Sequence, residues 1–171
     1  MHEQIQTHES ELIRYGFYFV KNIEVARDMA QDSFLKLWQQ DIEQIKNYSK
    51  AWLFRVCRNR CLDYLKKEKP MVSIVSIGSK QEMQVEDQTS KNLEAEQTKN
   101  HLHQQIAKLS DKYQEVIRLK FQNEMSYKQI AEVTGSSVSH VGVLLHEGIK
   151  SLRKNMQLSD KVSSDGGIKN D

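Results

Sequence analysis

The sequence contains little cysteine, proline or glycine, and it has no long hydrophobic run. Its 171 residues include 2 cysteines, 1 proline and 7 glycines. Two cysteines are too few for the disulfide framework of a small secreted domain, so we expect a protein of the reducing cytoplasm. Few glycines and one proline argue against turn-rich β-sandwiches and barrels and favour helices. No run reaches the ~18 apolar residues of a membrane-spanning helix, and the N-terminal segment shows no signal-peptide pattern.

The net charge is also small, because 25 lysines and arginines face 23 acidic residues, which leaves +2. A large excess of positive charge, which is typical of nucleic-acid-binding proteins, is therefore absent from the whole chain. The charge is unevenly distributed, however. Residues 1–70 carry 12 basic and 10 acidic side chains and residues 96–156 carry 9 and 6, whereas residues 71–95 carry 2 and 4 and residues 157–171 carry 2 and 3. The two positive segments are also the two with helical periodicity.

This pattern predicts an all-α protein with two small helical domains, at residues 1–70 and 96–156. We expect a flexible linker at residues 71–95 and a disordered tail at residues 157–171. The linker begins after Pro70, which we expect to end the preceding helix. Residues 71–77 alternate as a strand would, but the sequence offers no sheet for them to join.

Apolar residues in the first domain recur at intervals of three and four, as on one face of a helix. They predict three helices, near residues 12–20, 26–38 and 49–68. The residues expected to face inward are Leu12, Ile13, Phe17 and Val20 on the first helix, Ala26, Met29, Ala30, Ser33, Phe34, Leu37 and Trp38 on the second, and Leu53, Val56, Cys57, Cys61, Tyr64 and Leu65 on the third.

The second domain contains a pair of helices joined by a tight turn. Ser126 and Gln129 match a capping box at the start of the first helix, Gly135 ends it, and Ser137 can cap the next. This order is typical of a DNA-binding helix-turn-helix, although any αα-hairpin has the same spacing. Two further helices are expected upstream, with inward-facing Leu102, Ile106, Leu109, Tyr113, Val116, Ile117 and Phe121.

Three motifs, in this order, resemble bacterial sigma factors of the sigma-70 family. Residues 26–38, ARDMAQDSFLKLW, are similar to the region 2.2 helix, and residues 51–67, AWLFRVCRNRCLDYLKK, to regions 2.3 and 2.4. Residues 109–154 resemble region 4, with YKQIA at 127–131 in the first helix of the helix-turn-helix. Two such regions without another domain are typical of the small extracytoplasmic-function (ECF) group. The resemblance implies an initiation factor that binds core RNA polymerase and directs it to promoters.

The resemblance also implies a polymerase-docking face on the helix at residues 26–38. In the family this face contacts the clamp helices of the largest polymerase subunit. Helical spacing places four residues on the side away from Phe34 and Trp38. The alternative is that these residues form an ordinary solvated face. The predicted core-polymerase-binding residues are Asp28, Gln31, Asp32 and Leu35.

A basic cluster follows at residues 55–67 of the third predicted helix, opposed there only by Asp63 and interleaved with Phe54 and Tyr64. Cations that contact phosphates and aromatic rings that stack on bases suit partly single-stranded DNA, whereas in an ordinary amphipathic helix the aromatics belong to the core. The resemblance implies that this helix reads and melts the promoter −10 element. Asn59 would lie near an unstacked base, and Tyr48 would stack on it. The predicted −10 DNA-binding residues are Tyr48, Arg55, Arg58, Asn59, Arg60, Lys66 and Lys67.

The second helix of the helix-turn-helix departs from the family pattern. Gly142, Val143, Leu144 and Glu147 stand where most relatives carry Lys, Ser, Arg and Arg, so few guanidinium groups remain to read guanine. Gly142 and Gly148 each cost about 1 kcal/mol in a helix unless close packing compensates. The competing interpretation is an apolar face that packs on a protein, such as an anti-sigma factor or an activator. The predicted −35 DNA-binding residues are Lys128, Ser137, Ser139, His140, Val143, His146, Lys150, Arg153 and Lys154.

Cys57 and Cys61 lie one helical turn apart, but no histidine or further cysteine follows at zinc-ligand spacing. We therefore expect two small buried side chains and no metal site. No nucleophile–base pair or phosphate-binding loop is recognisable either, so we expect neither a cofactor nor enzymatic activity.

The sequence thus predicts a sigma factor with two partners. One is core RNA polymerase, bound at its clamp helices and, through residues 102–121, at its flap; the other is promoter DNA, both duplex and partly single-stranded. An anti-sigma factor is a further candidate partner, and no membrane insertion is expected. The alternatives are a stand-alone helix-turn-helix regulator and a protein-interaction module that sequesters a polymerase partner.

Overall fold

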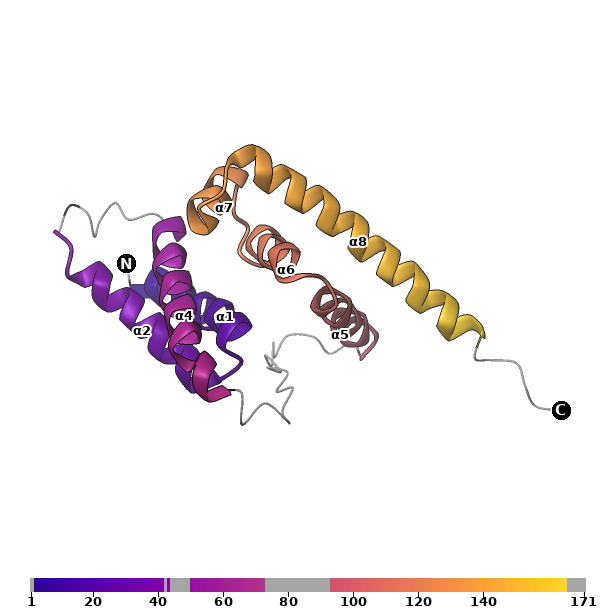
Figure 1. The fold of residues 1–171 in the computed structure, drawn as a ribbon, viewed down its shortest axis with the longest axis horizontal. Coiled ribbons are helices and arrows are strands. Elements are labelled where there is room, and N and C mark those ends of the chain that lie inside the picture. The colour runs from indigo at the N-terminus through magenta and orange to yellow at the C-terminus, as the bar shows by residue number, and fades with distance from the viewer. Residues whose placement is uncertain (1, 42, 44–49, 73–92, 166–171) are drawn as a thin grey trace. The chain divides into compact units, whose positions relative to one another are not determined.

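The computed structural model of the protein describes residues 2–41, 43, 50–72 and 93–165, and these residues are almost entirely helical (Figure 1). They contain no strand, so the prediction of an all-α protein is confirmed. The elements, in chain order, are α1 His2–Val20, α2 Ile23–Trp38, α4 Lys50–Val72, α5 Leu93–Ala107, α6 Asp111–Ile117, the π-helix η1 Arg118–Gln122, α7 Tyr127–Thr134 and α8 Val138–Asp165.

The fold divides into two compact units. The first contains α1, α2 and α4, and the second contains α5, α6, η1, α8 and the start of α7, while residues 131–136 are grouped with the first. The predicted domain limits remain predictions, because most of the predicted linker lies outside the described residues.

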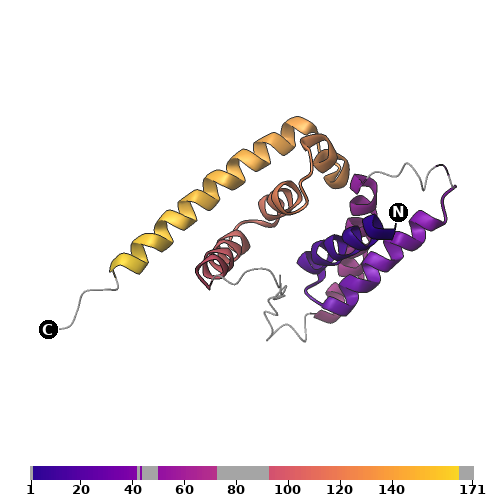
Figure 2. The ribbon, with the colours of Figure 1, turned by 180° about the vertical axis from the view of Figure 1, so that it is seen from behind.

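In the first unit, α1, α2 and α4 each pack against the other two, and the three helices lie together when the molecule is seen from behind (Figure 2). The aromatic ring of Tyr15 on α1 lies 5.1 Å from that of Phe54 on α4 and 5.2 Å from that of Phe19, measured between centroids. Such edge-on and tilted pairs stabilise a core beyond the area they bury. The fully buried side chains of this unit are Leu12, Ala26, Ala30, Ser33, Ala51, Leu53, Phe54, Cys57 and Cys61.

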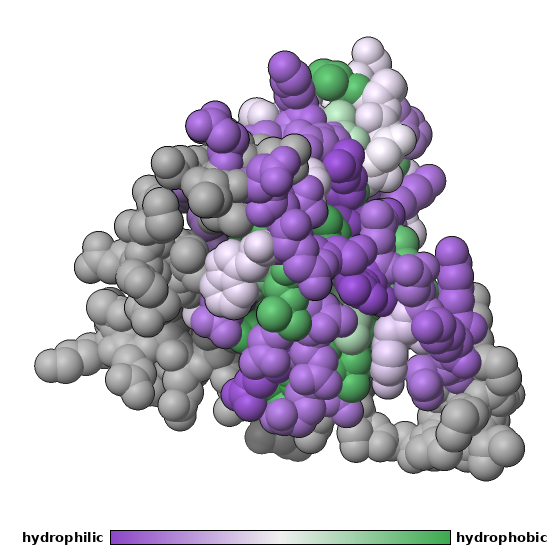
Figure 3. Space-filling view, turned by 90° about the vertical axis from the view of Figure 1, so that its left-hand side faces the viewer, coloured by the Kyte–Doolittle hydropathy of each residue, from purple (hydrophilic) through white to green (hydrophobic). Residues whose placement is uncertain are grey.

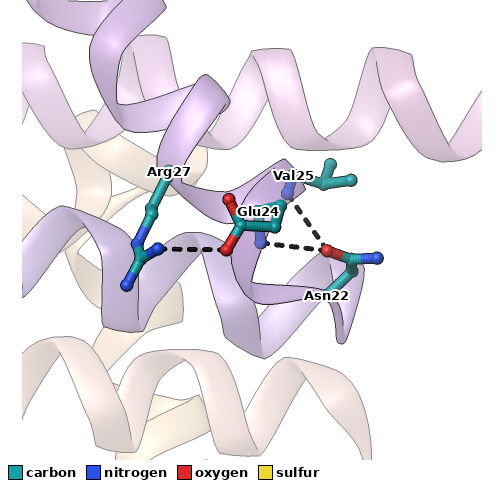
Figure 4. Close-up of polar contacts among 4 residues, drawn as sticks. All are labelled: Asn22, Glu24, Val25 and Arg27. Atoms are coloured by element: carbon teal, nitrogen blue, oxygen red, sulfur yellow. Dashed lines mark hydrogen bonds and ion pairs between the residues drawn. The ribbon is translucent and has the colours of Figure 1, made fainter.

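A tight corner joins α1 to α2. Lys21 adopts a left-handed conformation, with a φ of 53°, and the next residue, Asn22, caps α2. The Asn22 side chain accepts hydrogen bonds from the backbone N–H groups of Glu24 and Val25 at 3.0 and 3.2 Å (Figure 4). Glu24 also pairs with Arg27 at 3.0 Å within this first turn. The cap therefore fixes where α2 begins and which of its residues face outward.

Two aspects of the predicted core of this unit are wrong. In α1, Tyr15 and Tyr18 are buried, whereas the expected Phe17 and Val20 are only half-buried. In α2, Trp38 is 56% exposed instead of buried. A step of four residues advances a side chain by about 40° around an α-helix. Because Phe34 already lies at the edge of the buried face, this step carries Trp38 out of it.

Two helices are longer than predicted. The helix α4 continues to Val72, past Pro70, because a proline so close to the C-terminal end removes one backbone hydrogen bond and leaves the earlier turns intact. The helix α8 continues to Asp165, because residues 157–165 contain no glycine or proline to interrupt a helix. The predicted disordered tail remains a prediction. Residues 73–77, predicted to alternate like a strand, and residues 166–171 lie outside the described residues.

In the second unit, α5 and α6 pack along α8. A Cβ atom added at Gly148 of α8 would lie 3.1 Å from Cδ1 of Ile117 and 3.2 Å from Cβ of Tyr113 on α6. The missing side chain thus allows α6 and α8 to approach closely, which is the compensation that a glycine inside a helix requires. The apolar core residues of this unit include Ile106, Leu109, Val116, Ile117, Leu119, Met125, Val141 and Leu145.

The π-helix η1 changes which residues face the core of this unit. The backbone N–H of Asn123 donates to the carbonyl oxygen of Arg118, five residues earlier, at 3.2 Å, which is the wider turn of a π-helix. Leu119 is buried, whereas Phe121, predicted to face inward, is 59% exposed. The extra residue in the turn rotates Phe121 off the apolar stripe, so that prediction is wrong.

Candidate protein and nucleic-acid interfaces

The outer side of α2 carries all four residues predicted to bind core polymerase. Asp28, Gln31 and Leu35 are exposed and Asp32 is half-buried, whereas the core residues of α2 lie on the opposite side. Trp38 joins this surface beside Leu35, because residues three apart are neighbours on a helix. We refer to Asp28, Gln31, Asp32, Leu35 and Trp38 as the α2 face.

Trp38 lies on the α2 face, although the sequence pattern predicts it to be in the core. The sequence does indicate this position, because a spacing of three residues places Leu35 and Trp38 on one side of the helix. Leu35 is 51% exposed, so two large apolar side chains lie next to the two carboxylates of the α2 face. Exposed tryptophan flanked by charged residues is typical of protein interfaces.

The helix α4 places three of the predicted DNA-binding residues on one exposed line. Arg55, Asn59 and Lys66 are all exposed, and their spacing of four and seven residues keeps them on the same side of the helix. We refer to these three residues as the α4 line. Lys67 is also exposed, one position further around the helix. The α4 line therefore combines two cations with an amide that can donate and accept hydrogen bonds.

The other two predicted arginines lie on opposite flanks of α4. Arg58 and Arg60 are both half-buried, and a separation of two residues places them about 200° apart around the helix. Nη1 of Arg60 lies 3.9 Å from Oδ2 of Asp32 on α2. The structure thus brings Arg60 to the edge of the α2 face, while Tyr48 lies outside the described residues.

The aromatic residues near the α4 line do not offer stacking surfaces as expected. Phe54 is fully buried against Tyr15, so the alternative that it belongs to the core is correct. Tyr64 is half-buried, as is Trp52. Among the described residues, the outer side of α4 is therefore polar, with Asp63 among its cations and without an exposed aromatic ring.

Cys57 and Cys61 are both free thiols in the core. The hydrogen bond to Cys61, together with burial, raises the pKa of the Cys57 thiol well above its usual range. A thiol that stays protonated is a poor metal ligand and a poor nucleophile. Within the described part of the chain, no group of three His, Cys, Asp or Glu side chains is placed to hold a metal ion.

The helix-turn-helix has the predicted local structure. Ser126 and Gln129 form a reciprocal capping box, in which each backbone N–H donates to the other side chain, at 2.9 and 3.2 Å. Gly135 has a φ of 72°, a left-handed conformation that glycine adopts without strain and that ends α7. The hydroxyl oxygen of Ser137 accepts a hydrogen bond from the backbone N–H of His140 at 3.1 Å, so Ser137 caps α8.

The exposed side of α8 carries most of the residues predicted to contact the −35 element. Ser139, Val143, His146, Lys150 and Arg153 recur at intervals of four and three and are all exposed. We refer to them as the α8 stripe. Ser139 and Val143 at its start have small side chains, whereas Lys150 and Arg153 further along are cationic. The other predicted −35 residues are exposed as well; these are Lys128, Ser137, His140 and Lys154.

Apolar side chains border the start of the α8 stripe. Val143 is 58% exposed, and Tyr127 and Val138 are also exposed. The ammonium group of Lys120 lies 5.6 Å from the ring centroid of Tyr127. A Cβ atom at Gly142 would meet the Tyr127 ring at 3.6 Å, an ordinary contact, so the fold does not require glycine at this position.

The surface shown in Figure 3 is mainly hydrophilic, with smaller hydrophobic areas between charged and polar side chains. Scattered exposed apolar residues are normal on a globular protein, and only those that share a face with charged or polar groups indicate a binding site. Of the helices that the structure describes, none is both long and apolar enough to span a membrane.

Comparison with known proteins places both units in one family. The family model for sigma-70 region 2 matches residues 4–70, and that for sigma-70 region 4 matches residues 99–152. Together these matches cover more than two thirds of the chain and include the α2 face, the α4 line and most of the α8 stripe.

Relatives and a solved structure agree with these matches. The RNA polymerase sigma factor YlaC of Bacillus subtilis is 29% identical over 87% of this chain and 87% of its own length. The ECF RNA polymerase sigma factor SigW of the same species is 25% identical over 90% of this chain and 87% of its own length. The sigma factor RpoE of Bartonella quintana, solved in complex with the anti-sigma factor NepR, has the same fold, with a TM-score of 0.66 and 19% identity over 91% of this chain and 95% of that one. The chain belongs to the sigma-70 family of RNA polymerase sigma factors, in its ECF group, and acts in promoter-directed transcription initiation.

Proposed function

We propose that three exposed surfaces divide the work of this sigma factor. The α2 face binds core RNA polymerase, the α4 line engages the −10 element, and the α8 stripe lies on the −35 element. The observation that carries the proposal is the separation of the α2 face from the α4 line on two different helices of one packed unit. If it is correct, substitutions on the α2 face reduce core binding, whereas substitutions on the α4 line reduce DNA melting at full core occupancy.

The chemistry of the α2 face suits a partner that is both basic and apolar. Asp28 and Asp32 can pair with cations, and Gln31 can donate and accept hydrogen bonds. Leu35 and Trp38 supply the large apolar area that dominates binding energy at the centre of protein interfaces. Helices of a polymerase clamp that carry arginine or lysine next to apolar residues would complement this surface.

The α4 line suits DNA that is partly unpaired. Arg55 and Lys66 can contact phosphates, which position a strand without reading its sequence. Asn59, between them, can satisfy the edge of a base that has left the stack. Because Phe54 is buried, base stacking by this helix is not part of the proposal.

The α8 stripe favours DNA positioning over direct base readout. Lys150 and Arg153 provide phosphate contacts, whereas Ser139 and Val143 offer only a hydroxyl and methyl groups to the bases. A methyl group can contact the C5-methyl of thymine, but no guanidinium lies in the first turns to read guanine. We therefore expect weak sequence discrimination in the −35 region. The exposed apolar residues beside the stripe support a second candidate, in which this part of α8 packs on a protein.

We assign the remaining interactions from chemistry and analogy. Phe121, exposed on η1, can contribute to docking of residues 102–121 on the polymerase flap. RpoE of Bartonella quintana binds an anti-sigma factor, and by analogy we propose such a regulator for this chain. The proposal assigns binding rather than catalysis to every surface, and it places the protein in the cytoplasm, where core polymerase acts.

Replacing Lys150 and Arg153 with alanine is expected to lower the salt dependence of promoter binding. Each lost phosphate contact reduces the slope of log K against log salt by about 0.9, so the double variant should lose up to about two slope units. Binding of the variant sigma factor with core polymerase to promoter DNA would be measured across a salt series. Lys99→Ala, which removes an exposed cation from α5 outside the residues assigned to the flap, is the matched control. An unchanged slope in the double variant would favour a protein partner for α8.

A further inference from the structure

Arg60 differs from the other cations of α4 in where its side chain is held. Its Nε atom is buried and has no hydrogen-bond partner among the described residues, whereas Nη1 lies 3.9 Å from Oδ2 of Asp32. The Arg60 side chain is therefore packed along the seam between α4 and α2, and it meets solvent near the α2 face. Arg55 and Lys66, in contrast, project from the exposed side of α4.

The contact between Arg60 and Asp32 leaves the carboxylate open to a third group. A separation of 3.9 Å is an ion pair but is too long for a hydrogen bond, so the acceptor positions of Asp32 are not used by Arg60. Both side chains are only partly buried, at 39% exposure for Arg60 and 42% for Asp32. A cation of a binding partner can therefore approach Asp32 while Arg60 stays in place.

Asp32 also needs a cation nearby for an intrinsic reason. Asp28 and Asp32 lie four residues apart on α2, and like charges at this spacing repel. Without a neighbouring positive charge, the two carboxylates would favour rotamers that separate them. The Asp28 and Asp32 side chains would then leave the orientations that they have on the α2 face. Arg60 supplies such a charge from the neighbouring helix, in addition to Lys36, which lies one turn beyond Asp32 on α2.

We propose that Arg60 is a positioning residue of the polymerase-docking surface and not a contact to −10 DNA: its guanidinium holds the Asp32 carboxylate in the orientation in which it meets a cation of core polymerase. The inference rests on the proposed docking function of the α2 face. It moves Arg60 from the DNA-binding set, to which the sequence assigns it, to the protein-binding set.

A double-mutant cycle on the full chain tests this inference. Asp32→Asn, Arg60→Gln and the double variant would be compared by their affinity for core RNA polymerase, and open-complex formation would be measured at saturating core. Arg60→Gln should weaken core binding by about two- to fivefold, the range of a partly exposed ion pair. Asp32→Asn should weaken it further, and the double variant should be no weaker than Asp32→Asn alone. Melting at saturating core should be unchanged by Arg60→Gln.

Two controls separate positioning from general charge and from folding. Arg55→Gln removes the same charge from the exposed side of α4, and its effect on core binding should show no coupling to Asp32→Asn. Arg60→Lys, which keeps the charge, should restore part of the affinity lost in Arg60→Gln. Thermal unfolding of each variant would show that the bundle remains intact.

The outcomes distinguish the inference from the proposal on which it rests. If Asp32→Asn weakens core binding but the Arg60→Gln loss simply multiplies with it, the positioning role is refuted and the docking surface stands. If Arg60→Gln binds core normally and fails to melt DNA, Arg60 is a DNA contact and the inference is wrong. If Asp32→Asn leaves core affinity unchanged, the docking function of the α2 face fails, and the role of Arg60 fails with it.

Discussion

Combining Gln31→Ala with Asp32→Arg is expected to weaken capture of core RNA polymerase by at least about 100-fold. The few residues that dominate an interface each cost about 2 kcal/mol or more when they are truncated, and a loss of about 3 kcal/mol corresponds to more than 100-fold in affinity. The arginine at position 32 would also face a basic partner and lie beside Arg60, so attraction becomes repulsion. Affinity would be measured by titrating labelled sigma factor with core polymerase.

Retention of the fold is essential to this result. Gln31 is exposed and Asp32 is half-buried, so neither substitution removes a core side chain, and the helical circular dichroism should be unchanged. Glu124→Arg, which reverses an exposed charge in the second unit, is the control and should bind core normally. Capture of core by the α2 variant at the wild-type level would show that the α2 face is only a solvated surface.

Combining Arg55→Ala with Asn59→Ala is expected to leave core binding intact and to slow open-complex formation by about 30-fold or more. One phosphate contact and one base-edge contact together contribute about 2–4 kcal/mol, and each 1.36 kcal/mol in a barrier changes a rate tenfold. Melting would be followed by the reactivity of unpaired thymines to permanganate, at saturating core polymerase.

A promoter with a pre-formed bubble at the −10 element provides the control for this second variant. If the α4 line acts in melting, the bubble should restore much of the transcription, because the unfavourable unpairing step has already been made. Failure to bind core would instead indicate damage to the bundle. Wild-type melting by the variant on duplex DNA would contradict the assigned role.

Local signals in the sequence predicted much of the second unit. The capping box of Ser126 and Gln129, the left-handed Gly135 and the cap at Ser137 each depend on residues within one helical turn. Such short-range hydrogen bonds form with little dependence on the rest of the fold. The sequence also indicates that Gly148 destabilises its helix. It does not indicate that close packing of α6 against Gly148 compensates for this cost, because that contact joins residues far apart in the sequence.

The sequence predicts the residues of the candidate sites less completely, because a small rotation around a helix decides whether a side chain is buried or exposed. The stripe of α2 drifts by about 40° for every four residues, so Trp38 leaves the core and joins the α2 face. The π-turn of η1 exposes Phe121 through an added residue that no sequence pattern indicated. Arg60 belongs to a basic cluster in sequence, but only the packing of α4 on α2 brings it to Asp32.

The near-neutral charge of the chain fits a factor that depends on polymerase. With 25 basic and 23 acidic residues, the isolated chain can neutralise few phosphates at once, so its affinity for free DNA should be low. Core polymerase would supply the missing binding energy once the α2 face has docked. This dependence distinguishes a sigma factor from a stand-alone helix-turn-helix regulator.

In vitro transcription of genomic DNA by core polymerase, with and without this chain, is the decisive test of whether the chain acts as a sigma factor. We expect discrete promoter-initiated transcripts that require the chain and disappear with the variant that combines Gln31→Ala and Asp32→Arg. Tight binding of DNA by the chain alone, together with no new transcripts from core polymerase in its presence, would show that it acts as a stand-alone DNA-binding protein.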